Sequence, residues 1–254
     1  MLYEYIKNPS SQNLRDWVQS IRDGIAVAAF GVSGAAAYYL AALPERKVLY
    51  IAPNSVRAKE ATRELECLTG EKAVFLPPKD DVLLYKKFFN KESLYKRVTA
   101  LYESRTARFL VTTPEALMQL IPDKIDAFQL ASAHEYPLDS VKERLLSLGY
   151  KREEFAEEKG TFALRGDILE VYPVSSDTAY RFDFFGDSLE SIKELDENRK
   201  TGEEVRSVVI LPTVDFRADP SEVENIFKRL GASVKKCKTL RSSVRAKQIA
   251  SEIK

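Results

Sequence analysis

The most constraining feature of this sequence is a regular alternation of short apolar runs and amphipathic stretches between residues 24 and 122. Each apolar run is bounded by glycine, proline or charged residues, which is typical of strands buried on both faces of a parallel sheet. Strands are expected at 24–31, 47–53, 72–78 and 108–114, and the helices that follow them at 35–45, 55–70, 91–104 and 114–122. This order predicts a doubly wound α/β lobe with right-handed crossovers.

Local signals at the helix ends agree with this pattern. Ser55 and Thr113 stand where a side-chain oxygen can accept a hydrogen bond from the free N–H groups of a helix start. Pro114 suits a first helical position and Gly70 suits a helix end. A further amphipathic helix is predicted at 11–22, ahead of the first strand.

The segment FGVSGAAAYYL, residues 30–40, begins like a phosphate-binding loop between a predicted strand and a predicted helix. Such a loop needs a second glycine, a lysine and a hydroxyl at fixed distances from its first glycine. Counted from Gly31, those positions hold Ala36, Ala37 and Tyr38, and Gly34 lies out of register. We therefore expect no nucleotide hydrolysis and no cofactor. The segment is interpreted as a tight strand-to-helix turn, with weak anion binding at the helix start as the alternative.

The pattern changes at about residue 124, where closely spaced strands replace the alternation. One helix is expected at 138–149, followed by strands at 150–157, 160–173, 179–186, 188–196 and 205–212. Strands joined by short polar turns predict a small α+β unit with antiparallel strands. Beyond it, helical patterns at 219–231 and 233–254 look like a third piece cut short. The last of these is basic, and we interpret it as a solvated helix face, with contact to a phosphate backbone as the alternative.

The strand AYRFDFFG, residues 179–186, has two different faces. Because side chains alternate along a strand, Tyr180, Phe182 and Phe184 share one face, which is predicted to be the core. The other face carries Arg181, Asp183 and Phe185. Arginine beside an exposed aromatic ring is typical of residues that dominate protein–protein binding.

Arg165 is predicted to extend this surface. It lies on the face opposite Phe162 and Leu164, next to Gly166, where a bulge could turn it. A surface of Arg165, Arg181 and Phe185 is therefore a candidate docking site. The alternative is that Arg181 pairs with an acid on a neighbouring strand and that Phe185 only caps its hairpin.

Composition excludes several other classes of protein. The net charge of +1 gives no chain-wide attraction to nucleic acid or membrane, and the N-terminus does not read as a signal peptide. No apolar run approaches the roughly 20 residues that a membrane helix needs, so a cytoplasmic protein without membrane partners is expected. With His134 as the one histidine and two cysteines far apart, neither a zinc site nor a catalytic triad is expected.

Several stretches together resemble the UvrB-like module of bacterial transcription-repair coupling factors. In order along the chain they are GVSGAAAYYLAAL, VLYIAPN, FLVTTPEALMQ, LRGDILEVYPV, YRFDFFGDSLESIKELD and VVILPTVDF. The specific part is the pairing of an RGDILEVYP strand with an RFDFFGD strand. The resemblance implies a degenerate RecA-like lobe, of the P-loop NTPase and helicase type, with a small α+β domain inserted in it. It divides the chain into 1–123 (domain 1A), 124–212 (domain 2) and 213–254, an incomplete start of domain 1B.

The resemblance also implies a partner. In this family domain 2 binds the damage-recognition ATPase UvrA, as UvrB does, and the matching positions here are Arg165, Arg181 and Phe185. A longer parent protein would carry the motor, and would have RNA polymerase and double-stranded DNA as further partners. The expected function is therefore recruitment of UvrA by a module that is not an enzyme, which requires that the docking surface not be buried against the chain's own lobe.

The alternative is an ATP-dependent, UvrB-like enzyme that acts on damaged DNA. UvrB keeps the glycine, lysine and threonine that are replaced here by Ala36, Ala37 and Tyr38. An enzyme would need another cation in place of the lysine, for which only Arg57 or Lys59 could be named. The interval between the third strand and the next helix is also too short for the DNA-clamping hairpin of UvrB.

Overall fold

The structure, a computed structural model, describes residues 11–31, 35–43, 47–79, 90–196 and 198–215. All of these residues belong to one compact unit. The predicted helices at 219–231 and 233–254, and Gly34, lie outside the described residues. The predicted domain boundaries at 123/124 and 212/213 stay predictions.

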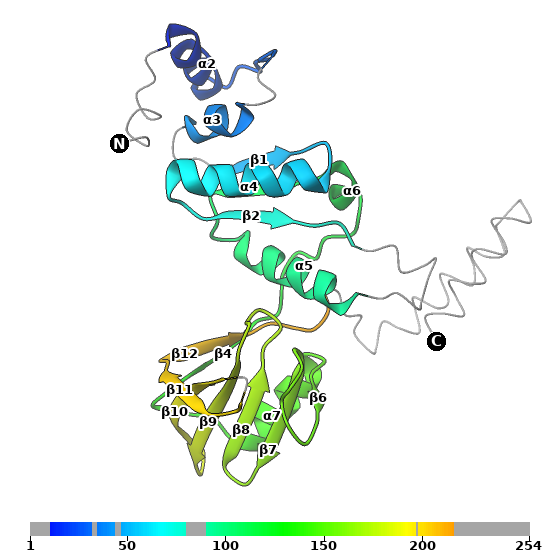
Figure 1. The fold of residues 1–254 in the computed structure, drawn as a ribbon, viewed down its shortest axis with the longest axis vertical. Helices are drawn as coiled ribbons and strands as arrows, with labels where there is room; N and C mark the ends of the chain where they lie inside the picture. The colour runs from blue at the N-terminus through cyan, green and yellow to red at the C-terminus, as the bar shows by residue number, and fades with distance from the viewer. Residues whose placement is uncertain (1–10, 32–34, 44–46, 80–89, 197, 216–254) are drawn as a thin grey trace, which may run out of the picture. The chain divides into compact units, whose positions relative to one another are not determined.

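The first part of the unit is a parallel sheet between helices, as the alternating pattern predicted (Figure 1). Its strands β1 (Val48–Ile51), β3 (Phe109–Thr112) and β2 (Ala73–Leu76) lie in this order, and both pairings are parallel. Side chains of these strands pack against helices in two layers. Phe109 and Val111 pack with helix α4 (Ser55–Thr69), while Val74 and Leu76 pack with helix α5 (Lys91–Glu103).

Helix ends follow the expected chemistry with one exception. Gly70 ends α4 in the left-handed conformation at φ 68°, which costs glycine little. Thr113 caps α6 (Pro114–Leu117), with Pro114 at its first position. The prediction that Ser55 caps α4 is wrong. The cap is Asn54, whose side chain accepts from the N–H of Arg57, because Asn54 is the last residue with extended backbone.

The predicted buried strand at 24–31 is wrong. After helix α2 (Gln12–Arg22) the chain at 25–30 has no strand pairing, and Ile25 and Phe30 are 58% and 91% exposed. A short helix, α3 (Ala36–Ala41), follows. An apolar run becomes a buried strand only when a neighbouring edge pairs with it, and among the described residues β1 pairs with β3 alone. Alternate residues of β1 are consequently exposed as well.

The second part of the unit is a mainly antiparallel sheet backed by one helix. The hydrogen-bonded order is β11-β10-β9-β8-β7-β6, with β5 beside β10, and only the short β6–β7 pair is parallel. The bounds are β5 His134–Glu135, β6 Lys151–Arg152, β7 Thr161–Arg165, β8 Ile168–Tyr172, β9 Ala179–Phe185, β10 Ser188–Leu195 and β11 Thr201–Glu204. A separate antiparallel pair is formed by β4 (Phe128–Ala131) and β12 (Ser207–Ile210). Sequence patterns missed the short strands β4, β5 and β11.

Helix α7 (Leu138–Ser147) fixes which face of this sheet is the core. Its Val141 and Leu145 are buried in one cluster with Phe162, Leu169 and Phe182 from three neighbouring strands. The same cluster includes side chains of β2 and α5, so the two sheets share one continuous core. The other face of the sheet, turned away from α7, is called the open face below.

A buried charge cluster joins segments that are distant in the sequence. Arg97 on α5 is fully buried and donates from Nε to Asp215 Oδ2 at 3.0 Å. Its Nη1 and Nη2 donate to the carbonyl oxygens of Pro77 and Leu120 at 2.6 and 3.4 Å. Lys79 Nζ contacts the same Asp215 oxygen at 2.9 Å. The cluster thereby ties the end of the second part of the chain to β2, α5 and the segment after α6.

Candidate protein-docking surface

Two tight hairpins hold two of the predicted docking residues in place. Gly166 and Gly186 occupy the turns after β7 and β9 with φ 57° and 59°, a conformation that short hairpin turns require and glycine tolerates. Arg165 and Phe185 are the strand residues immediately before these glycines. The predictions of one strand at 160–173 and of a bulge at Gly166 are wrong, because Gly166 lies in a turn that divides this stretch into the antiparallel strands β7 and β8, whose register is unbroken.

Strand register places the three predicted residues on one face. Arg165 pairs with Ile168, and Ile168 pairs with Asp183, so these side chains project on the same side. Arg181 and Phe185 stand two positions before and after Asp183 along β9 and share that side. Since Phe182 and Phe184 are buried at 0% and 6% exposure, this side is the open face.

Arg181 is held in a charged cluster on the open face. Its Nε donates to Asp183 Oδ1 at 2.7 Å, while Ser191 Oγ and Lys193 Nζ contact Asp183 Oδ2 at 3.1 and 3.3 Å. Burial alone would raise the pKa of Asp183, but the hydrogen bonds from Arg181, Ser191 and Lys193 outweigh it, and the pKa of this carboxyl is lowered. Asp183 therefore stays ionised near neutral pH and fixes the direction of the Arg181 guanidinium.

Arg165 and Phe185 are open to a partner. The Phe185 side chain is 79% exposed, the largest exposure among the apolar residues of this sheet that the structure describes. Arg165 is exposed, and its guanidinium lies 3.9 Å from the centroid of the Phe155 ring and donates to the Glu154 carbonyl at 2.5 Å. Among the residues that the structure describes, none buries Arg165 or Phe185, and the Arg181 side chain is 34% exposed, which agrees with what the docking hypothesis requires.

The sequence analysis missed two residues that contact each other beside the docking surface, Phe155 and Arg199. The Arg199 guanidinium lies 4.2 Å from the same Phe155 ring and forms an ion pair with Glu170. Glu170 in turn stands opposite Arg181 in the β8–β9 register. Phe155 comes from the segment after β6 and Arg199 from the turn after β10, so no local pattern could have brought them together.

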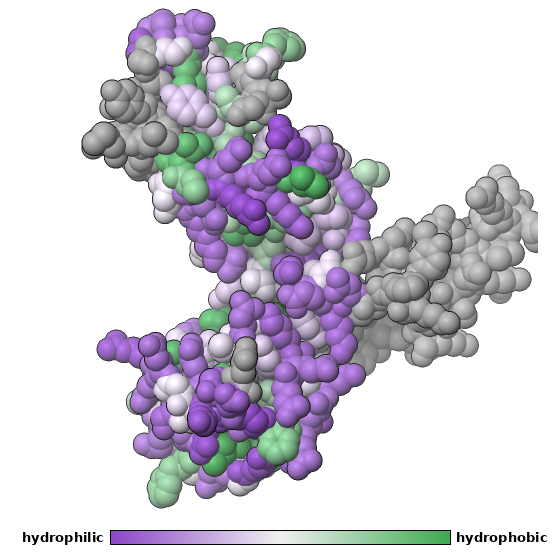
Figure 2. Space-filling model, viewed as in Figure 1, coloured by the Kyte–Doolittle hydropathy of each residue, from purple (hydrophilic) through white to green (hydrophobic). Residues whose placement is uncertain are grey.

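The space-filling view shows the character of this surface. In Figure 1 helix α7 lies behind β7 and β8, so the viewer faces the side of these strands away from the helix. Figure 2, in the same view, shows mostly hydrophilic residues over these strands with isolated hydrophobic side chains among them. A mainly polar surface with single aromatic anchors suits a reversible protein contact better than a permanent one.

The described residues of the glycine segment 30–40 form no comparable surface. Gly31 is exposed with φ 74°, and Gly34 lies outside the described residues. Ala37, at the position where a phosphate-binding loop has lysine, is 2% exposed and packs against α4. Ala36 and Tyr38 are partly buried in the same short helix. A lysine at position 37 would have to leave this packing to reach a phosphate.

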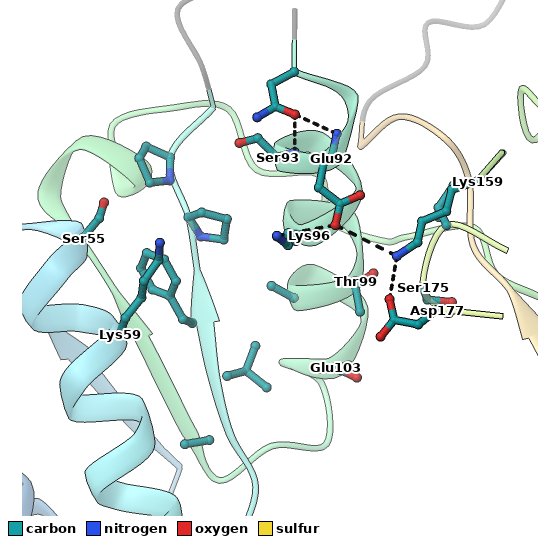
Figure 3. Close-up of a pocket in the computed structure, with 18 residues that line it drawn as sticks. Ser55, Lys59, Glu92, Ser93, Lys96, Thr99, Glu103, Lys159, Ser175 and Asp177 are labelled. Atoms are coloured by element: carbon teal, nitrogen blue, oxygen red, sulfur yellow. Dashed lines mark hydrogen bonds and ion pairs between the residues drawn. The ribbon is translucent and has the colours of Figure 1, made fainter. Parts of the chain in front are cut away.

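A pocket of about 620 Å³ lies elsewhere, beside α4, β2 and α5 (Figure 3). Its lysines are largely neutralised. Glu92 contacts Lys96 at 3.4 Å and Lys159 at 4.0 Å, and Lys159 contacts Asp177 at 2.8 Å. Lys59 also lines the pocket, and it makes no ion pair with any residue that the structure describes. No described residue of the segment 31–38 lines this pocket.

Within the described ranges, no group of three or more His, Cys, Asp or Glu side chains is arranged to hold a metal ion. No helix in that same part of the chain is long and apolar enough to cross a membrane.

Comparison with known protein families agrees with the resemblance found in the sequence. Residues 128–216 match the family described as the UvrB interaction domain. This range contains β4 to β12 and all three residues of the candidate docking surface.

Similarity to individual proteins extends further along the chain. UvrABC system protein B of Thermotoga neapolitana is 28% identical over 223 residues, which cover 77% of this chain and 34% of that protein. The transcription-repair-coupling factor of Escherichia coli is 28% identical over 185 residues, covering 70% of this chain and 16% of that protein. The transcription-repair-coupling factor of Haemophilus influenzae is 27% identical to this chain over 182 residues.

These matches confirm that the chain is similar to both groups of proteins over most of its length. The chain spans about a third of the length of the first relative and about a sixth of the length of the second.

Proposed function

We propose that this chain is a non-catalytic adaptor module of a transcription-coupled DNA repair factor of the cytoplasm. It recruits UvrA through the open face of its second sheet, with Arg165, Arg181 and Phe185 as the main contacts. In a longer parent protein, RNA polymerase and double-stranded DNA are the further partners, and other parts of that protein carry the motor.

One observation carries the proposal: the three residues share one exposed face inside the range that matches the UvrB interaction domain. Arginine supplies forked, charge-assisted hydrogen bonds, and an exposed phenylalanine supplies an apolar anchor that is buried on binding. The names of both relatives connect them with repair, one as a UvrABC component and the other as a transcription-repair-coupling factor.

Alanine substitutions on the open face test the docking role. We expect Arg181→Ala and Phe185→Ala each to weaken UvrA binding by roughly 1–3 kcal/mol, the usual range for dominant interface residues. The measurement is titration calorimetry of the 254-residue chain with purified UvrA. Neither variant should lose its far-UV circular dichroism spectrum.

The matched control is Arg144→Ala. Arg144 is an ion-paired arginine on α7, whose buried residues pack against the opposite face of the sheet. Its replacement should leave UvrA affinity unchanged. Equal losses in the Arg144 and Arg181 variants would show that general charge, and not the open face, governs binding.

The non-catalytic part of the proposal is tested separately with nucleotide. We expect no magnesium-dependent binding of ATP at micromolar concentrations and no release of phosphate, because Ala37 and Tyr38 replace the groups that hold triphosphate and metal. Calorimetry with ATP and Mg²⁺, followed by a phosphate-release assay, measures both. Tight binding that Lys59→Ala abolishes would instead favour the UvrB-like enzyme.

A further inference from the structure

The charges of the open face are unequally satisfied. Arg181 and Lys193 share Asp183, and Arg199 has Glu170 as its acid. Arg165 forms no ion pair with any residue in the described ranges; its recorded polar contact is the Glu154 carbonyl. The guanidinium is planar and has five N–H donors, and the carbonyl oxygen accepts from one of its nitrogens. Arg165 is exposed and therefore presents a positive charge that no described acidic residue neutralises.

The position of this charge is fixed by residues that the proposed function does not yet include. Phe155 lies under the Arg165 guanidinium, with Arg199 over the same ring. An aromatic face attracts a cation, and a planar guanidinium stacks on it better than an ammonium group does. Glu170, at 12% side-chain exposure, holds Arg199 from the sheet below.

The backbone at Arg199 shows an additional constraint. Its φ of 62° is in the left-handed region, which a residue other than glycine adopts at an energetic cost. The turn is closed by hydrogen bonds from Arg199 N and Lys200 N to Asp196, at 2.9 and 2.7 Å. Glycine would suit this conformation better, so the turn itself does not require arginine. The Arg199 side chain is 28% exposed, and strain of this kind at a charged residue that is still accessible is a reason to look for a role in binding.

We propose that Phe155 and Arg199 hold the Arg165 guanidinium as a receptor for a carboxylate on the partner protein. This inference rests on the proposed function, and it adds the chemistry of the partner: an acidic side chain of UvrA that pairs with Arg165. A forked guanidinium on a fixed ring can bind both oxygens of one carboxylate. Phe155 and Arg199 are positioning residues, and Arg165 makes the contact.

The test uses single and double variants of the 254-residue chain and purified UvrA. We expect Arg165→Lys, which keeps the charge but loses the planar fork, to bind about tenfold more weakly. We expect Phe155→Leu to lose about fivefold, and the effect of Arg165→Lys to shrink in the Phe155→Leu background because the two residues act together. Added NaCl should weaken UvrA binding by the wild-type chain. It should weaken binding by Arg165→Gln less, because this variant lacks one ion pair with the partner.

Arg199→Gly separates binding from stability. Glycine relieves the left-handed strain but leaves the Glu170 carboxylate, 12% exposed, without its ion pair, so the melting temperature should fall, while the UvrA affinity of the folded variant falls about threefold to tenfold. A purely structural role predicts the same fall in melting temperature with the UvrA affinity of the folded variant unchanged. If Phe155→Leu fails to fold, Arg199→Gly and Arg165→Lys still decide the matter.

The outcomes distinguish this inference from the proposed function. Wild-type affinity in Arg165→Lys and Arg199→Gly, with binding lost in Arg181→Ala and Phe185→Ala, overturns only the carboxylate receptor. Wild-type affinity in all four overturns the docking role of the open face itself.

Discussion

Replacing Arg97 by methionine should lower the free energy of unfolding by about 3–5 kcal/mol, the usual cost of removing one partner from a buried ion pair. The side chain of Arg97 is 0% exposed and that of Asp215 is 6% exposed. Without the guanidinium, the Asp215 carboxylate keeps Lys79 as its one ion-pair partner among the described residues, and the carbonyl oxygens of Pro77 and Leu120 lose this donor. Urea unfolding followed by circular dichroism measures the change.

Two comparisons make this result interpretable. Arg57 pairs with Glu60 on α4, but both side chains are about half exposed, so Arg57→Met should leave the free energy of unfolding nearly unchanged. The double variant Arg97→Met with Asp215→Leu should recover part of the loss, because no buried carboxylate remains. If Arg97→Met proves as mild as Arg57→Met, the cluster does not hold these segments together.

Phe182→Ala should cost about 3–5 kcal/mol of unfolding free energy, the range for removing a fully buried phenylalanine. Phe182 is 0% exposed and packs in the cluster shared with α7. Its control is Phe185→Ala three residues along the same strand, where the 79% exposed ring predicts a change within roughly 0.5 kcal/mol. The same urea experiment measures both variants.

The Phe182 and Phe185 variants together separate residues needed for binding from residues needed for folding. Phe185→Ala is expected to weaken UvrA binding with stability retained, and Phe182→Ala to lower stability. If Phe182→Ala does not fold, Phe182→Leu should give a smaller loss of about 1 kcal/mol. Similar stability losses at positions 182 and 185 would contradict the assignment of core and open faces.

Much of this architecture was predictable because its causes are local. Alternation along β9 separated Phe182 and Phe184 from Arg181 and Phe185, since successive strand residues point to opposite sides. Gly70 and Pro114 marked helix ends through their own backbone preferences. The candidate docking residues could thus be placed on one surface from the sequence, whereas their role still awaits a binding measurement.

What could not be predicted depends on distant partners. The apolar segment 25–30 has the composition of a strand, but pairing depends on an edge that composition cannot reveal. Arg97 sits in an amphipathic helix like any surface arginine, and its burial becomes clear only once Asp215 lies against it. Phe155 and Arg199 are far apart in the sequence, and they come into contact only because the sheet brings their segments together.

The hairpins that carry Arg165 and Phe185 close with two-residue turns between paired strands, and most of the other contacts of the open face come from the same sheet. A recognition surface built on strands surrenders little conformational entropy when a partner arrives, unlike one built on long loops. The two molecules can meet nearly as rigid bodies, which leaves shape and charge, and not folding on contact, to decide which partner is accepted.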